Sequence, residues 1–78
     1  MHVYIIRSVR CPNRRYIGCT RDIDQRLLAH NAGSVPHTGK FRPWTLELMV
    51  WFSDRKKAFQ FERYLKSGSG RAFAYRHF

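Results

Sequence analysis

The hydrophobic and polar positions of this chain follow patterns that predict three β-strands. Residues 3–6 are β-branched or aromatic, and residues 15–19 read as a second strand after the turn signal Cys11-Pro12-Asn13. We therefore expect these two segments to form an antiparallel hairpin. Residues 44–52 alternate as a third strand would. One side of that strand carries Trp44, Leu46, Leu48, Val50 and Phe52, and the other carries Thr45, Glu47, Met49 and Trp51.

A first helix is predicted for residues 22–31, directly after the hairpin. Thr20 and Asp22 are both suitable N-terminal caps, because their side-chain oxygens can accept hydrogen bonds from the free amides of the first turn. Gly33 is the expected C-terminal stop. Residues 32–43 show no periodicity and are rich in turn-forming residues, so we expect a long loop there, of the kind that is often functional.

A second helix is predicted for residues 55–66, with Ser53 or Asp54 as its cap. The Ser-Gly-Ser-Gly sequence of residues 67–70 is expected to end it, and residues 71–78 are expected to form a final short helix. The order is therefore β-β-α-β-α-α. It defines an α+β domain with a small three-stranded antiparallel sheet and helices packed on it.

The composition indicates one small, strongly basic domain that spans residues 1–78. Fifteen Lys and Arg residues against five Asp and Glu residues give a formal net charge of +10 at pH 7. A small domain that keeps this self-repulsion is expected to use it on phosphates or on an anionic membrane surface. We favour nucleic acid, and the alternative is a ribosome-associated or simply basic surface protein.

The apolar segments and the cysteines bear on where the protein works. No segment approaches the ~18–20 apolar residues that a membrane-spanning helix needs, so no membrane partner is expected. Cys11 and Cys19 are not spaced as a C-x-x-C metal motif. We expect both to be free thiols in a reducing, cytoplasmic setting.

The first predicted helix carries an arginine and a histidine beside its apolar stripe. Arg26 and His30 are four residues apart and share a side of the helix with Ile23 and Leu27. Taken singly, they are most simply an arginine with a solvated head group and a histidine at the edge of the core. A functional role needs further support from other segments.

The second predicted helix places a carboxylate, Glu62, among apolar side chains. A carboxylate on a buried face is costly unless it is paired or holds a metal ion. Lys66 lies four residues further on, so an ordinary helix ion pair worth ~0.2–0.5 kcal/mol is the alternative. We favour a functional role for Glu62. Its apolar neighbours are Ala58, Phe59, Phe61, Tyr64 and Leu65.

The predicted hairpin carries two tyrosines, Tyr4 and Tyr16, whose rings share a sheet face if they lie opposite each other. A stacked core pair is the simple alternative. Gly18, inside a strand, marks a close backbone approach or a bulge. A catalytic site is favoured only by the combination of these tyrosines with an arginine, a histidine and a glutamate in a strongly basic domain.

In their order and spacing these residues resemble the GIY-YIG nucleases, which are named for two strand motifs about ten residues apart. The motifs here read His2-Val3-Tyr4 and Tyr16-Ile17-Gly18, so the second is intact and the first keeps its tyrosine. Arg26 and His30 fall where the family places its helix arginine and a following histidine, and Glu62 falls where it places a metal-binding glutamate. The similarity covers nearly the whole chain and includes a tail like that of small standalone bacterial members. Many members also carry an asparagine after the glutamate helix, and none follows Glu62 here.

The resemblance implies a metal-dependent endonuclease that leaves 5′-phosphate and 3′-hydroxyl ends. Glu62 would bind Mg²⁺ or Mn²⁺, and the planar fork of Arg26 would hold the phosphate. The resemblance also implies a tyrosine as general base for the attacking water. We favour Tyr16, with Tyr4 orienting the water or sharing its proton. His30 would hydrogen-bond a tyrosine or relay its proton.

Other cations of the chain are expected to contact the DNA backbone, which carries no base code. The chain has no room for an added sequence-reading domain, so we expect low sequence specificity, with branched or single-stranded DNA as open alternatives. The competing hypotheses are a non-catalytic nucleic-acid-binding module and an accessory subunit that docks an acidic protein. The oligomeric state is left open. The predicted DNA contacts are Arg14, Arg15, Arg21, Lys40, Arg42, Lys66 and Arg71.

Overall fold

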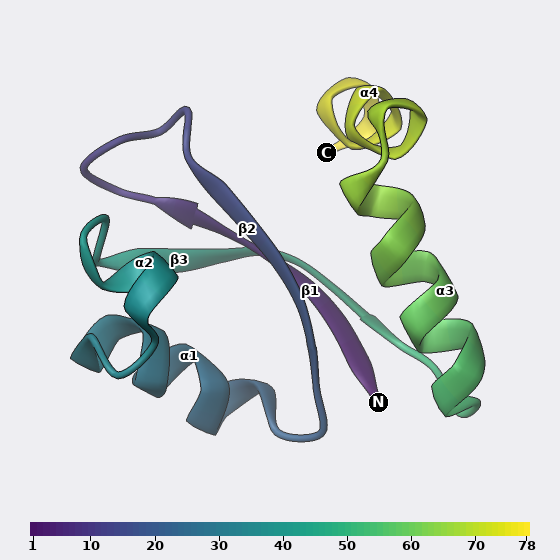
Figure 1. The fold of residues 1–78 in the computed structure, drawn as a ribbon, viewed down its shortest axis with the longest axis horizontal. Coiled ribbons are helices and arrows are strands. Elements are labelled where there is room, and N and C mark those ends of the chain that lie inside the picture. The colour runs from purple at the N-terminus through teal and green to yellow at the C-terminus, as the bar shows by residue number, and fades with distance from the viewer.

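A three-stranded antiparallel sheet lies between two pairs of helices in the computed structural model of residues 1–78 (Figure 1). The elements in chain order are β1 (His2–Ser8), β2 (Arg15–Thr20), α1 (Ile23–Ala32), α2 (Pro36–Gly39), β3 (Trp44–Trp51), α3 (Arg55–Lys66) and α4 (Gly68–His77). The predicted α+β class and the order of the strands and long helices are confirmed.

Two details of the predicted elements are wrong. The expected loop contains the short helix α2, which begins at Pro36, because a proline ring sets the backbone angle that a first helical position needs. The helix α4 begins at Gly68, three residues before the predicted start. The Ser67 hydroxyl accepts a hydrogen bond from the Gly70 amide and caps α4, so the glycines form its first turn.

The longer helices begin and end for the predicted local reasons. Asp22 caps α1 by accepting from the Gln25 amide, and Asp54 caps α3 by accepting from the Lys56 amide. At the end of α1, Gly33 adopts a left-handed conformation with φ of 80°, which favours glycine. None of the helices is long and apolar enough to cross a membrane.

The central strand, β1, separates two hydrophobic clusters. The strand order is β2-β1-β3, so both edges of β1 are paired. Val3 and Ile5 point to the face that α3 covers and pack with Leu65. Tyr4 and Ile6 point to the face that α1 and α2 cover. Because side chains alternate along a strand, the same short segment supplies the core of both layers.

A bulge in β3 divides the alternating pattern that predicted this strand. Ile5 pairs with Leu48, but its neighbour Ile6 pairs with Leu46, so Glu47 is the extra residue. Leu48 packs against the cluster under α3, whereas Leu46 falls on the face that carries Ile6. The expectation that the five alternating apolar residues lie on one side is therefore wrong.

Candidate active site

The phenol of Tyr4 lies at the centre of a polar network on the α1 face of the sheet. Tyr4 is 1% exposed. Its hydroxyl oxygen is 2.8 Å from Nε2 of His30 and 3.4 Å from Nε of Arg26. The arginine Nε–H can only donate, so the tyrosine O–H has the histidine nitrogen as its acceptor. The predicted residues from β1 and α1 therefore meet.

His30 is fully buried and uses both ring nitrogens. Its Nδ1 lies 2.7 Å from the hydroxyl oxygen of Thr38, and that hydroxyl reaches the Val35 carbonyl oxygen at 3.3 Å. If Thr38 donates to Val35, its oxygen accepts from Nδ1–H. This arrangement satisfies Tyr4, His30 and Thr38 at the same time. The network thus assigns the proton to Nδ1 and leaves Nε2 as a base facing Tyr4.

Thr38 is a site residue that the sequence did not indicate. It lies in α2 and is 1% exposed. Its carbonyl oxygen accepts a hydrogen bond of 2.8 Å from the indole N–H of Trp44. The only signal in the sequence was Pro36, which can begin a helical turn. Nothing local shows that this turn folds back onto His30.

Tyr16 and Gly18 complete the site from β2. Tyr4 pairs with Gly18, and Tyr16 pairs with Ile6, so the two tyrosines are diagonal neighbours and do not lie directly opposite each other. They still share a face, with ring centroids 6.3 Å apart. A Cβ on Gly18 would lie 2.6 Å from the Tyr4 hydroxyl oxygen. Glycine is therefore the residue that leaves room for this phenol.

Arg26 lies close to both phenols but forms a hydrogen bond only with Tyr4. Tyr4 and Tyr16 each raise the pKa of the Arg26 guanidinium, Tyr4 more strongly, and only the Tyr4 hydroxyl lies within hydrogen-bonding geometry. Tyr16 is half-buried, and its ring centroid is 4.9 Å from that of His30. The two tyrosines thus have different surroundings: Tyr4 has an acceptor for its proton, and Tyr16 does not.

Burial sets the protonation of this network. It lowers the pKa of His30, with the Arg26 charge as a second cause, so the imidazole is neutral at pH 7. Burial also raises the pKa of Tyr4, although the nearby Arg26 opposes it. The resting site therefore holds a neutral phenol against a neutral imidazole. A proton that leaves Tyr4 has His30 as its destination.

Glu62 lies in the other helix layer, on α3. Its Oε2 accepts from the Lys66 ammonium at 3.1 Å, which is the helix pair that the sequence offered as the simple alternative. Its carboxylate also reaches the edge strand β2. Together with burial, the larger cause, it raises the pKa of Cys19 to about 11, and its charge contributes to the raised pKa of Tyr4. No hydrogen bond joins Glu62 to Tyr4, Tyr16 or Arg26. It lies near the predicted site but forms no hydrogen bond or ion pair with its other members.

The donor set fits one kind of metal ion. No group of three or more His, Cys, Asp or Glu side chains forms a protein cage. A lone, partly exposed carboxylate such as Glu62 suits Mg²⁺ or Mn²⁺, which keep several waters and also take phosphate oxygens. A soft or cage-bound metal does not fit.

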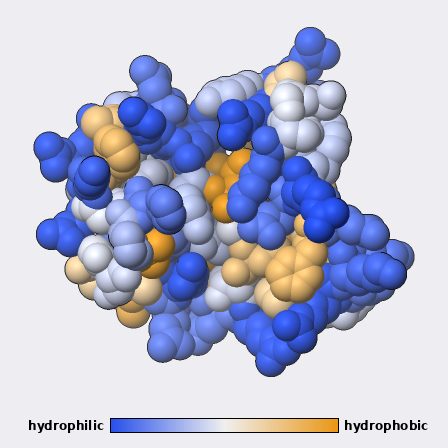
Figure 2. Space-filling view, in the orientation of Figure 1, coloured by the Kyte–Doolittle hydropathy of each residue, from blue (hydrophilic) through white to orange (hydrophobic).

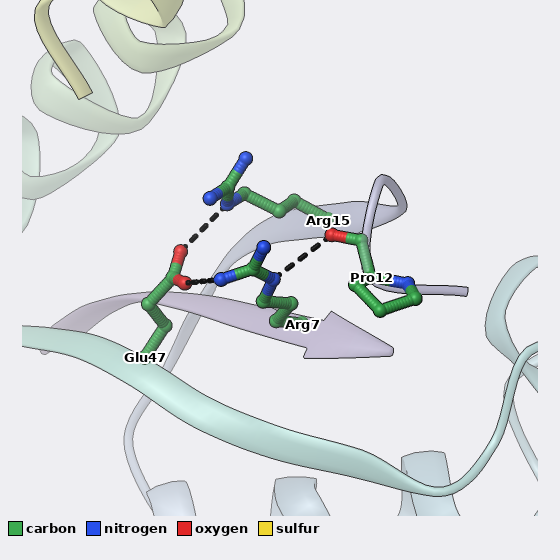
Figure 3. A network of polar contacts seen from close by, with 4 residues as sticks. All are labelled: Arg7, Pro12, Arg15 and Glu47. Carbon is green, nitrogen blue, oxygen red and sulfur yellow. Dashed lines mark hydrogen bonds and ion pairs between the residues drawn. The ribbon is translucent and has the colours of Figure 1, made fainter. Parts of the chain in front are cut away.

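One predicted DNA contact, Arg15, is engaged within the protein. Its Nε lies 2.7 Å from Glu47, and its guanidinium lies 4.5 Å from the centre of the Tyr75 ring. Figure 3 shows that Glu47 also binds Arg7, which donates to the Pro12 carbonyl oxygen. The bulge in β3 thus supplies a carboxylate that holds two arginines in place.

The other predicted DNA contacts divide into engaged and free side chains. The guanidinium of Arg14 lies over the Phe41 ring, at 4.7 Å from its centre, and Arg42 donates to the Ala32 carbonyl oxygen. Lys66 is paired with Glu62. Three exposed cations have no side-chain hydrogen bond or ion pair: Arg21, Lys40 and Arg71.

Comparisons with known proteins identify several relatives of this chain. The chain is 42% identical over 71 residues to the structure-specific endonuclease subunit SLX1 of Candida dubliniensis, covering 82% of this chain and 25% of that protein. The protein of the same name from Malassezia globosa is 42% identical over 64 residues, covering 76% of this chain and 14% of that protein. That from Debaryomyces hansenii is 39% identical over 71 residues, covering 82% and 20%. The chain thus spans a quarter or less of these relatives. No solved structure matches.

A family model, the GIY-YIG catalytic domain, matches residues 1–76. This match covers the hairpin, the helix that carries Arg26 and His30, and the helix that carries Glu62. The resemblance noted in the sequence is confirmed: the chain belongs to the family of the GIY-YIG catalytic domain.

Proposed function

We propose that this protein is a metal-dependent endonuclease that hydrolyses phosphodiester bonds of DNA at branched or otherwise irregular structures. The observation that carries the proposal is the buried hydrogen-bonded chain from Tyr4 through His30 to Thr38. Buried polar groups of this kind are expensive and are expected to have a use. The net charge of +10 and the structure-specific relatives support DNA as the substrate.

Tyr4 takes the role of proton carrier, which was expected for Tyr16 from the sequence. As water attacks the phosphorus, it transfers a proton to the Tyr4 oxygen, and the phenolic proton passes to Nε2 of His30. The phenol thus stays neutral overall, which suits its raised pKa. The neutral imidazole becomes a cation, with its Nδ1–H held by Thr38. General base catalysis of this kind contributes typically ~10²–10⁴-fold in rate.

Arg26 is placed to hold the phosphate. Its Nε donates to Tyr4, which leaves both terminal amino groups of the half-buried guanidinium for phosphate oxygens. A guanidinium that bridges the base and the substrate would fix the attacking water in line with the phosphorus. Tyr16, beside His30, would border the same water.

Glu62 is the residue that would hold Mg²⁺ or Mn²⁺. When bound, the ion supplies Lewis-acid stabilisation of charge on the phosphate and the departing 3′-oxygen. To bind the ion, the Glu62 carboxylate would have to release Lys66, and the freed ammonium would then be available to the DNA backbone. The expected products have 5′-phosphate and 3′-hydroxyl ends. Low base specificity is proposed because the cations described here would read backbone charge.

A cleavage assay tests the proposal. Purified protein is incubated with supercoiled plasmid, a flap or branched DNA and a linear duplex, in Mg²⁺, Mn²⁺ or EDTA. We expect metal-dependent cutting near the branch, lost in Glu62→Gln and Arg26→Ala. The matched controls are Asp24→Asn and Arg10→Ala, exposed side chains without bonded partners, and they should cut as the parent does.

Two outcomes would overturn the proposal. Equal cutting in EDTA would remove the metal and Glu62 from the account. Tight, salt-sensitive binding by the parent without cutting would instead indicate a nucleic-acid-binding module that keeps the fold.

A further inference from the structure

A groove runs between β2 and α4, on the face of the sheet opposite Tyr4. It encloses about 380 Å³, and the buried side chains of Ile5 and Leu65 lie along it. Figure 2 shows apolar atoms in a hollow between the sheet and the C-terminal helices, with hydrophilic side chains around it. Its size is that of a small-molecule site. A DNA duplex is far too wide to enter it.

The groove is lined by cations and by no carboxylate. Its charged lining residues are Arg14, Arg15, Lys66 and Arg71. Arg71 is exposed and has no side-chain partner. Arg15 and Lys66 are paired with Glu47 and Glu62, so Arg14 and Arg71 are the cations of the groove without a carboxylate partner. Such a lining favours an anion such as a phosphodiester.

The groove also holds an aromatic platform. Tyr75, on α4, is 62% exposed, and the Arg15 guanidinium lies 4.5 Å from its ring centre. Arg15 is itself fixed by Glu47 at 2.7 Å, so a flat guanidinium and a flat ring are held together. Exposed aromatic rings beside cations are the features by which proteins stack unpaired bases.

We propose that this groove binds one unpaired nucleotide of the DNA substrate, with its base against Tyr75 and its phosphate near Arg71. Tyr16 connects the groove to the active site, because it lines the groove while its ring lies 4.9 Å from His30. A single strand seated here crosses the β2 edge towards Tyr4. The groove thereby gives the domain a means to select DNA that has an unpaired arm. This inference rests on the proposed nuclease function for its substrate.

The test measures binding without cleavage. Fluorescence anisotropy of a labelled single-stranded oligonucleotide is recorded in EDTA for the parent and for Tyr75→Leu, Tyr75→Phe and Arg71→Gln. Because one stacked base is lost, Tyr75→Leu should bind about tenfold more weakly, and Tyr75→Phe should bind as the parent does. Arg71→Gln should lower the salt dependence of binding by about one phosphate contact. Arg76→Gln, on the same helix but outside the groove, is the charge-matched control and should leave binding unchanged.

A matched duplex separates this groove from a general basic surface. We expect Tyr75→Leu to leave duplex binding unchanged, since a duplex offers no free base. Equal loss for duplex and single strand, or no loss for either with a far-UV circular dichroism spectrum like that of the parent, would overturn the proposal. The assay measures binding and needs no cleavage, so its result can be interpreted even if the nuclease proposal fails. Conversely, if the parent protein cleaves DNA but Tyr75→Leu does not weaken single-strand binding, the nuclease function stands and the proposed role of the groove is wrong.

Discussion

The two faces of the sheet bury different chemistry. On the face covered by α1 and α2, the chain encloses a tyrosine, a histidine and a threonine that bond one another. On the face covered by α3 and α4, it encloses aliphatic side chains, and the charged groups remain at the rim as ion pairs. Alternate residues of the single strand β1 supply buried side chains to both faces.

Under the proposed function, this difference separates stability from catalysis. An aliphatic core stabilises the fold in proportion to the area it buries, at roughly 25 cal/mol per Å². A buried polar network gains little net free energy, because each bond replaces one to water. The α1 face therefore contributes less to stability than an apolar core of its size. Its proposed role depends on the positions of the protons on Tyr4 and His30. Substitutions on the two faces should therefore change different quantities, the free energy of unfolding on one face and the rate of cleavage on the other.

The largest expected effect on stability comes from the aliphatic face. Leu65→Ala should lower the free energy of unfolding by about 2–5 kcal/mol, because it removes a fully buried side chain and leaves a cavity. Urea denaturation measures it. The rate of cleavage per folded molecule should fall far less than it does in Tyr4→Phe. Leu28→Ala is the control, since Leu28 is 70% exposed, and a loss as large as that of Leu65→Ala would contradict the assignment.

The polar face should respond to pH. The lowered pKa of His30 means that the imidazole accepts a proton from Tyr4 only above that pKa, so the single-turnover rate should fall about tenfold per pH unit below it. The free energy of unfolding should fall with decreasing pH, as the cleavage rate does. The unfolded chain protonates this histidine near its ordinary pKa of about 6.5, so unfolding becomes easier as the pH falls from there towards the lowered value. His77→Gln, at an exposed position, should leave both profiles in place. A rate that rises as the pH falls through this range would contradict the role of His30.

Thr38 should influence the rate through His30. Thr38→Val removes the acceptor for Nδ1–H and leaves a buried donor unpaired, which costs about 1–3 kcal/mol of stability. We expect roughly tenfold slower cleavage and a shifted pH profile, both restored in Thr38→Ser, because general base catalysis depends on the protonation state. A purely structural role for Thr38 would move the stability and leave the pH profile of the rate unchanged.

The smallest effect is expected at the rim. Glu47→Gln weakens the partly exposed pairs with Arg7 and Arg15 and should cost less than about 1 kcal/mol, declining further in high salt. Thermal unfolding at two salt concentrations measures it. A loss of stability comparable to that of Leu65→Ala would show that the ion pairs stabilise the fold as much as the aliphatic core does, which would contradict this division.

Much of this division could be predicted from the sequence. Period-two patterns predicted the strands, and the spacing of Arg26 and His30 predicted one shared helix face, because both depend on local geometry. The tyrosines were placed on one face, although their diagonal register was not anticipated. Local rules also placed both aspartate caps among two candidates each, and the structure identifies Asp22 and Asp54 as the caps.

The remaining features depend on contacts between distant segments. The bond from His30 to Thr38 forms only because α2 folds back over α1, and the carboxylate of Glu47, at the bulge, pairs with two arginines that come from the hairpin. The relation of Glu62 to the site depends on how α3 approaches the edge of the sheet. No short pattern encodes any of these arrangements.

The choice between the two tyrosines tests the account most directly. Single-turnover cleavage of a branched DNA should be compared for the parent, Tyr4→Phe and Tyr16→Phe, with unfolding free energies measured on the same samples. We expect Tyr4→Phe to cut about 10²–10⁴-fold more slowly while staying folded, because it removes the hydroxyl that passes a proton to His30. The cleavage rate of Tyr16→Phe should fall much less. Parent-like cleavage by Tyr4→Phe, with the loss found in Tyr16→Phe, would contradict the account.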